Sequence, residues 1–156
     1  MPVLVFGAVL AKYTVADIEV SFRATHMPYT HYMGMQSDIL RESMYVFNDL
    51  LTFGNFLSTV PSMDGVIPSF DENRETLVVV VSKSEPCVYL PKISAIYPQT
   101  WLSELPNRQS ILVSIAHEAP SNEDNVTCEP NNPISYIYNI VIVEKTNLPV
   151  SLEMPI

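Results

Sequence analysis

The stretch LVVVVS, residues 77–82, decides the fold, because its first five positions are apolar and four of them are Val. A strand of this composition offers no polar face to solvent, so we expect it at the centre of a β-sheet that is covered on both sides. The segment ISYIYNIVIV, residues 134–143, is nearly as apolar and predicts a second central strand. Whether this sheet is a single layer or part of a sandwich stays open.

Shorter segments with strand character complete the sheet. Residues 18–23 alternate apolar and polar side chains, which is the period-two signature of a half-buried strand. We also predict strands at about 2–10, 110–116 and 148–154. Pro149 has no N–H to donate, so the last of these strands belongs at a sheet edge. The 13 prolines against 4 glycines fit short strands joined by ordered loops.

One segment follows a different period. From residue 37 to residue 57, polar side chains recur every three to four positions, which predicts a long amphipathic helix with Ser37 as its N-cap. A short helical turn is expected at 99–105. The predicted fold class is therefore α+β: a mainly antiparallel β-sheet, compatible with a sandwich-like arrangement, with one long amphipathic helix.

The core is expected where one face of this helix packs on the central strands. Its predicted members are Leu40, Met44, Phe47 and Leu51 of the helix and Val78, Val80, Ile140 and Ile142 of the strands.

Composition limits the possible partners. The 156 residues fit one domain, 1–156. Charged residues make up 16% of the chain, below the roughly 25% of an average soluble domain, so we expect a protein partner to cover part of the surface. The formal net charge is −9 and the basic residues are scattered singly, which disfavours nucleic acid and anionic membranes as partners. No apolar run approaches the ~20 residues of a membrane span.

Two cysteines, Cys87 and Cys128, allow one disulfide. The apolar N-terminal run lacks the positively charged region of a signal peptide, so we expect both to be free thiols in a cytoplasmic or virion protein. For the same reason the glycosylation sequon that starts at Asn125 is expected to be unused. The alternative is an extracellular β-sandwich with a Cys87–Cys128 bridge and a glycan at Asn125, if an upstream signal has been trimmed.

The stretch THMPYTHYMGM, residues 25–35, holds two histidines among methionines and tyrosines. We expect it to be a loop between a strand and the helix, with Pro28 and Gly34 as turn residues. Three imidazoles can hold a catalytic zinc, and methionine sulfur suits copper(I). The available donors are His26, His31, His117, Glu118 and Met33. The usual short zinc spacings are absent, so we predict no metal site and no cofactor.

No catalytic motif of high specificity occurs. The chain has no G-x-S-x-G elbow, and its 4 glycines form neither G-x-G-x-x-G nor a P-loop. His117 beside Glu118 could be a base with its orienting carboxylate, or a rim histidine beside a solvated carboxylate. The acidic residues Asp38, Glu42 and Asp49 fit the solvated face of the predicted helix better than a catalytic pair. The sequence thus predicts no catalytic residues and favours a protein without enzymatic activity.

The leading hypothesis is a non-enzymatic structural or protein-interaction subunit. It would be a homo-oligomer or part of a larger assembly, such as a viral or phage-like particle. Its contact surfaces would be the edge strands and the two long hydrophilic loops, 61–75 and 118–133. The apolar face of the segment 147–156 would either contact a neighbouring subunit or close its own sheet.

The alternative hypothesis is a small-ligand binder or a hydrolase that acts on acyl substrates. A strand, a loop with a histidine and a glycine, a long apolar helix and then a run of strands follow one another along the predicted chain. This order is similar to the layout of hotdog-fold thioesterases over about half of the chain. The similarity implies a helix in the concavity of a curved antiparallel sheet.

Overall fold

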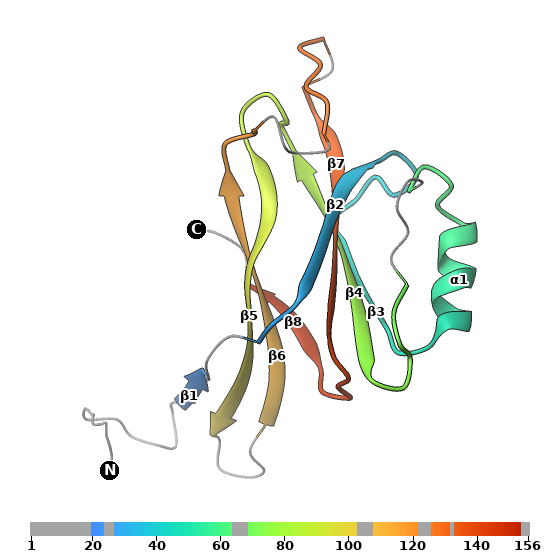
Figure 1. Cartoon of the computed structure of the whole chain (residues 1–156). Coiled ribbons are helices and arrows are strands. Elements are labelled where there is room, and N and C mark those ends of the chain that lie inside the picture. The colour runs from blue at the N-terminus through green and yellow to red at the C-terminus, as the bar shows by residue number, and fades with distance from the viewer. Residues whose placement is uncertain are drawn as a thin grey trace.

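The structure of the protein is a computed structural model, which describes residues 20–23, 27–63, 69–102, 108–121, 126–131 and 133–153. Within these ranges the chain forms eight strands and one helix (Figure 1). Their bounds are β1 Val20–Arg23, β2 Thr30–Gln36, β3 Ser43–Phe47, α1 Leu50–Ser58, β4 Glu75–Ser84, β5 Leu90–Leu102, β6 Arg108–Glu118, β7 Ser135–Glu144 and β8 Val150–Glu153. The strand predicted at 2–10 lies outside the described residues.

The strands form two four-stranded sheets. Sheet I has the order β1-β5-β6-β8, and sheet II has the order β2-β7-β4-β3. Neighbouring strands are antiparallel except β6 and β8, which are parallel. The two apolar stretches form β4 and β7, which pair at the centre of sheet II. The fold is therefore α+β and mainly antiparallel β, which confirms the predicted fold class.

The two sheets pack face to face, so the fold contains a sandwich. Along β4, Val78 and Val80 point toward sheet I, while Leu77, Val79 and Val81 point the other way, as alternation requires. We call the layer between the sheets the inter-sheet core. Its buried members are Val78, Val80, Ile93, Ile96, Ile111, Val113, Ile115, Val141 and Val143.

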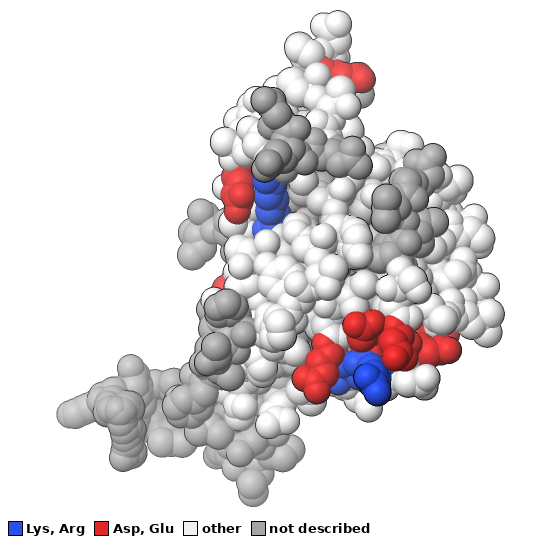
Figure 2. Space-filling view, viewed as in Figure 1, with Lys and Arg blue, Asp and Glu red and all other residues white. Residues whose placement is uncertain are grey.

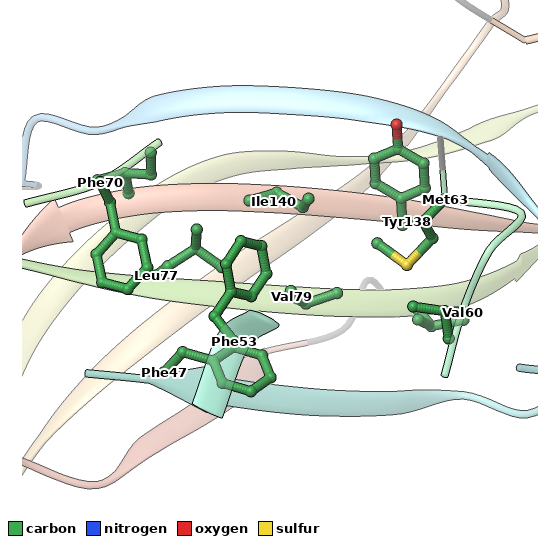
Figure 3. Packing of buried hydrophobic residues seen from close by; sticks show 11 residues of the cluster. Phe47, Phe53, Val60, Met63, Phe70, Leu77, Val79, Tyr138 and Ile140 are labelled. Carbon is green, nitrogen blue, oxygen red and sulfur yellow. The ribbon is translucent and has the colours of Figure 1, made fainter. Parts of the chain in front are cut away.

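The outer face of sheet II carries a second core, the helix-side core, under α1 and the segment that follows it (Figures 1 and 3). Its buried members are Phe47, Phe53, Val60, Met63, Phe70, Leu77, Val79, Val81, Tyr138, Ile140 and Ile142. The rings of Phe47 in β3 and Phe53 in α1 have centroids 5.2 Å apart. Met63 and Phe70 come from the predicted hydrophilic loop 61–75, which therefore contributes to the core. Because β4 is covered on both faces, its sequence shows no polar alternation.

The long helix predicted over residues 37–57 is wrong. Residues 43–47 form β3, which pairs antiparallel with β4, and α1 covers only Leu50–Ser58. The sequence SMYVF of β3 is rich in aromatic and β-branched side chains, which suit a pleated surface beside the valines of β4. Asp49, rather than Ser37, caps the helix, because its carboxylate accepts a hydrogen bond from the N–H of Thr52 at 2.7 Å.

The loop predicted over residues 25–35 is wrong in its second half. Thr30–Gln36 forms β2, an edge strand of sheet II that pairs with β7 along its length. Gly34 is therefore a strand residue and not a turn residue. A Cβ at this position would lie 2.5 Å from the phenol oxygen of Tyr138, so the close approach of that ring requires glycine.

The helical turn predicted at 99–105 is wrong as far as the structure describes it, because β5 continues to Leu102. Residues 103–105 lie outside the described ranges. The segment as far as Leu102 pairs with β6 on one side and β1 on the other. Pairing on both sides overrides the local helical spacing of its apolar residues.

The predicted core combines residues that sheet II separates. Val78 and Val80 lie in the inter-sheet core, whereas Ile140 and Ile142 lie in the helix-side core. The four residues expected on one helix face are also divided. Phe47 is in the helix-side core, Met44 packs against the inter-sheet core, and Leu40 and Leu51 are 66% and 75% exposed. Met44 and Phe47 are separated because residues 43–47 form a strand whose side chains alternate between two faces.

Strand β8 lies at the edge of sheet I, as Pro149 predicts. Val150 and Leu152 pack against the inter-sheet core from this strand. The apolar face of the segment 147–156 is therefore covered by its own sandwich as far as the described residues reach. A neighbouring subunit is not needed to cover that face, although the outer backbone edge of β8 remains at the end of the sheet.

Cys87 and Cys128 form a disulfide, with their Cα atoms 4.9 Å apart, so the predicted free thiols are wrong. The bond joins the tight turn between β4 and β5 to the segment before β7. It closes a sequence separation of 41 residues, which stabilises the fold by roughly 4 kcal/mol in the chain-entropy model. Asn125 of the sequon lies outside the described residues.

Candidate functional site

A buried polar cluster lies where β2 and β7 of sheet II approach β5 of sheet I. Asn139 of β7 is fully buried and faces the inter-sheet core. Its side-chain Nδ2 donates a hydrogen bond to the carbonyl of Pro91 at 2.9 Å. Its Oδ1 lies 2.6 Å from Nε2 of His31 in β2. One side chain therefore links three strands and both sheets.

The protonation of His31 follows from this arrangement. Because Nδ2 of Asn139 donates to a carbonyl, its Oδ1 is the acceptor, and Nε2 of His31 carries the hydrogen. Burial lowers the pKa of His31, and Lys92 lowers it further, whereas the bond to Asn139 and the carboxylate of Glu118 raise it. The net effect is a pKa below the usual value, so His31 is a neutral donor at pH 7.

Two further bonds tie the same side of the sandwich. The hydroxyl of Tyr29 donates to the carbonyl of Ile93 at 3.4 Å, and the N–H of Met27 donates to the carbonyl of Ile96 at 2.6 Å. Burial, and secondarily the charge of Glu118, raise the pKa of Tyr29, so its hydroxyl stays protonated. We call this region the stitched side. It is defined by Met27, Tyr29, His31 and Asn139, together with the β5 carbonyls that accept hydrogen bonds from Met27, Tyr29 and Asn139.

The opposite side of the sandwich is formed by different strands and different side chains. β3 and β8 are the strands farthest from the stitched side in the two sheet orders, and each is an edge strand. Met44, Val150 and Leu152 are half-buried against the inter-sheet core, while Val46 is 40% exposed. We call the region formed by the β3 and β8 edges the open side. The side chains that β3 and β8 pack against the inter-sheet core are apolar, whereas those of the stitched side include polar groups.

The structure separates the histidines considered for a metal site. His31 is bound to Asn139, whereas His117 on β6 is exposed and packs its ring against Tyr89, with centroids 4.4 Å apart. His26 lies outside the described residues. Within the described part of the chain, no three His, Cys, Asp or Glu side chains are grouped as a metal site would require.

The acidic residues of the predicted helix stripe accept main-chain hydrogen bonds instead of forming a catalytic pair. Asp38 accepts from the N–H of Ser62 at 2.7 Å and from its hydroxyl, and these bonds lower the pKa of Asp38. The bonds from Thr52 that cap α1 lower the pKa of Asp49. Glu42 accepts from the N–H of Lys83 at 3.4 Å. All three carboxylates hold loops and strand ends in place.

The charged side chains of the visible face are few and local. Figure 2 shows the described acidic groups gathered mainly around basic ones at one end, with most of the remaining described surface uncharged. The amino group of Lys145 donates hydrogen bonds to the main-chain carbonyls of Asn48 and Glu72. Lys92 forms an ion pair with Glu118 at 3.8 Å. No helix in the described ranges is long and apolar enough to cross a membrane.

An open groove of about 410 Å³ lies between the end of β2, the loop after it and the segment before β7. Leu40 and Ile134 line it and are 66% and 45% exposed. Glu129, next to the disulfide, lies in its wall with several serines. The groove offers an apolar surface with one carboxylate, which suits the binding of a small amphipathic group better than chemistry.

Sequence reasoning missed Asn139, Tyr29 and Lys92. The signal for Asn139 was present, because it is the one amide in the largely apolar run ISYIYNIVIV. A lone buried amide in a central strand needs hydrogen-bond partners, so it predicts a polar contact across the sheet. Nothing in the sequence indicates that His31 and Pro91 are those partners.

Comparisons of the chain with protein-family models, with curated proteins and with solved structures found no match. The function must therefore be argued from the geometry described above.

Proposed function

We propose that the protein is a non-enzymatic structural or protein-interaction subunit of a larger assembly. The observation that carries the proposal is the contrast between the two sides of the sandwich. The polar groups of the stitched side bind one another and hold the sheets together. Apolar side chains are left exposed on the edge strand β3 and at the start of α1, where a protein partner could cover them.

The best candidate for a catalytic group supports this proposal. A nucleophile needs a base within hydrogen-bond reach, and that base needs a group that orients it. His31 instead donates to an amide, and that amide donates to a main-chain carbonyl. This chain of bonds ends in the backbone of β5, so it serves the fold.

The disulfide favours an oxidising environment for the assembly. Disulfides persist in secreted proteins and on virion or cell surfaces and are rare in the cytosol. Of the two predicted locations, cytoplasm and virion, the Cys87–Cys128 bond supports the second. We therefore propose that the assembly is extracellular or part of a viral particle.

The hotdog-like alternative loses its main support. Its layout requires a long helix in the concavity of one sheet, but α1 spans only Leu50–Ser58 and the sheets form a sandwich. A small-ligand binder is favoured only by the open groove beside Leu40 and Glu129. A small ligand in that groove would leave the exposed apolar residues of β3 unexplained, whereas a protein partner would account for them.

Sedimentation velocity of the oxidised protein tests the proposal. Over concentrations from about 1 to about 200 µM, the range in which weak protein contacts form, we expect the mass to rise above that of one chain. The same samples in high salt are the control, since an apolar contact is retained when charges are screened. A chain that stays monomeric over the whole range would contradict a self-assembling subunit.

A further inference from the structure

Strand β3 is an edge strand without the usual protection against pairing. Natural edges are guarded by lysine, proline or a bulge, and the sequence SMYVF of β3 contains none of the three. One side of β3 pairs with β4 in regular register. Sheet II ends at the other side, so the outward N–H and C=O groups of β3 face the end of the sheet.

The local charge makes this edge suitable for contact between like chains. Two copies with a formal charge of −9 repel each other wherever their acidic residues approach. Ser43–Phe47 has no charged residue. Two copies that meet along this strand therefore bring no acidic side chain of β3 against another.

Exposed apolar area is also concentrated here. Seven large apolar side chains are exposed within the described residues, and three of them, Val46, Leu50 and Leu51, fall within six positions of the chain. Val46 is on β3 itself, and the two leucines begin α1 directly after it. A contact along β3 can cover Val46 and has further apolar side chains close by in the sequence.

The strand is complementary to itself. In an antiparallel pair centred on Tyr45, Met44 of one copy lies opposite Val46 of the other, and Ser43 lies opposite Phe47. The Met44–Val46 pair is apolar on the face that looks toward the inter-sheet core. Tyr45 would meet its own copy on the twofold axis, as an isologous interface requires.

We propose that two copies of the chain pair through β3 in an antiparallel twofold contact centred on Tyr45, which joins two copies of sheet II into one continuous sheet. This inference rests on the proposed function and specifies its contact. Five residues per copy bury less than the ~800 Å² per partner of a stable interface. The dimer is therefore weak and depends on concentration.

A charge placed on the edge tests the contact. Val46→Lys adds a solvated cation where the second copy would pack, so we expect the dimer to be lost across the concentration range in which the wild type sediments above one chain. Ser151→Lys is the matched control, because Ser151 is exposed on β8, the other strand of the open side. At a concentration where the wild type is monomeric, both variants should melt close to the wild type, since both positions are exposed.

A crosslink tests the register. Directly opposed residues in an antiparallel pair have Cα atoms about 5 Å apart, which a disulfide can bridge. Tyr45→Cys should therefore give a covalent dimer under mild oxidation. Ser43→Cys should not, because its two copies would lie roughly 13 Å apart along the paired strands.

The outcomes separate this inference from the proposed function. An oligomer that persists in Val46→Lys, or one that is lost only in Ser151→Lys, overturns the β3 contact and leaves the assembly subunit standing. A wild-type chain that is monomeric throughout overturns both the β3 contact and the self-assembling form of the proposed function. Crosslinking of Ser43→Cys without Tyr45→Cys would overturn the register.

Discussion

The two sides of this sandwich differ in what covers the edges of the sheets. Each sheet ends in strands whose backbone groups and apolar side chains need partners. On the stitched side, Tyr29, His31 and Asn139 supply those partners from within the chain. On the open side, β3 keeps regular strand geometry and exposes Val46. The buried polar residues of the stitched side therefore stabilise the fold, whereas the exposed apolar residues of the open side are the surface that we propose for contact.

The largest difference is expected between two adjacent residues of β3. Phe47 is 5% exposed and packs on Phe53 and Phe56, whereas Val46 is 40% exposed. Phe47→Ala should lower the free energy of unfolding by about 3–5 kcal/mol, and Val46→Ala by less than about 1 kcal/mol. Urea denaturation of both variants at a concentration that favours the monomer checks this. Equal losses would show that the two faces of β3 contribute equally to the stability of the monomer.

The next effect concerns the centre of the stitched side. Asn139→Ala leaves the carbonyl of Pro91 and Nε2–H of His31 buried without their partner, which should cost about 2–4 kcal/mol. Ser151→Ala, on the exposed edge of β8, is the control and should melt like the wild type. If Asn139→Ala unfolds at the wild-type urea midpoint, the bonds of the stitched side do not hold the sheets.

A smaller effect is expected from one hydroxyl. Tyr29→Phe removes a single long bond to the carbonyl of Ile93 at a half-buried position, so we expect a loss of about 0.5–1 kcal/mol. Tyr45→Phe on the open side, where the ring packs on Phe56, should change the stability of the monomer by less. Thermal unfolding of the two variants side by side measures the difference, and the opposite ranking would break the comparison.

The smallest effect is a pH dependence of the stitched side. The pKa of His31 is below its value of 6.5 in the unfolded chain, chiefly because burial disfavours the charged form. Below pH 6.5 the unfolded state therefore binds a proton that the folded state resists, so stability is complete above this pH and falls as the pH drops toward the folded pKa.

The matched variant for this pH dependence is His31→Gln, which retains a donor for Asn139 but does not titrate. We expect the urea midpoint to fall more between pH 7 and pH 5.5 in the wild type than in this variant. Parallel curves for the two proteins would show that His31 does not sense the pH.

The strands that could be predicted from sequence are those whose composition allows one arrangement. The valines of β4 admit no polar face, and Pro149 fits only an edge, so both placements are confirmed. Residues 43–57 allowed two arrangements, because the polar spacing of a helix and the alternation of a strand coincide there. Pairing of β3 with β4 decided between them, and that contact is not encoded locally.

The candidate site was less predictable than the fold. His31 was identified from sequence as a possible ligand, but its actual partner is Asn139, 108 positions away. The disulfide likewise joins cysteines 41 positions apart, which were predicted to be free thiols because the N-terminal run lacks the charged region of a signal peptide. Long-range contacts of this kind depend on the order of strands in the two sheets, which no single segment determines.

Amide hydrogen exchange as a function of protein concentration measures the contrast between the stitched side and the open side in one experiment. We predict that protection of the amides in 43–47 increases between about 1 and about 200 µM, the range of weak protein association. Protection of the amides in 27–31 should stay the same, since this segment is tied to β5 within each chain by Met27 and Tyr29. Unchanged protection of β3, or a rise confined to the stitched side, would show that chains do not associate through β3.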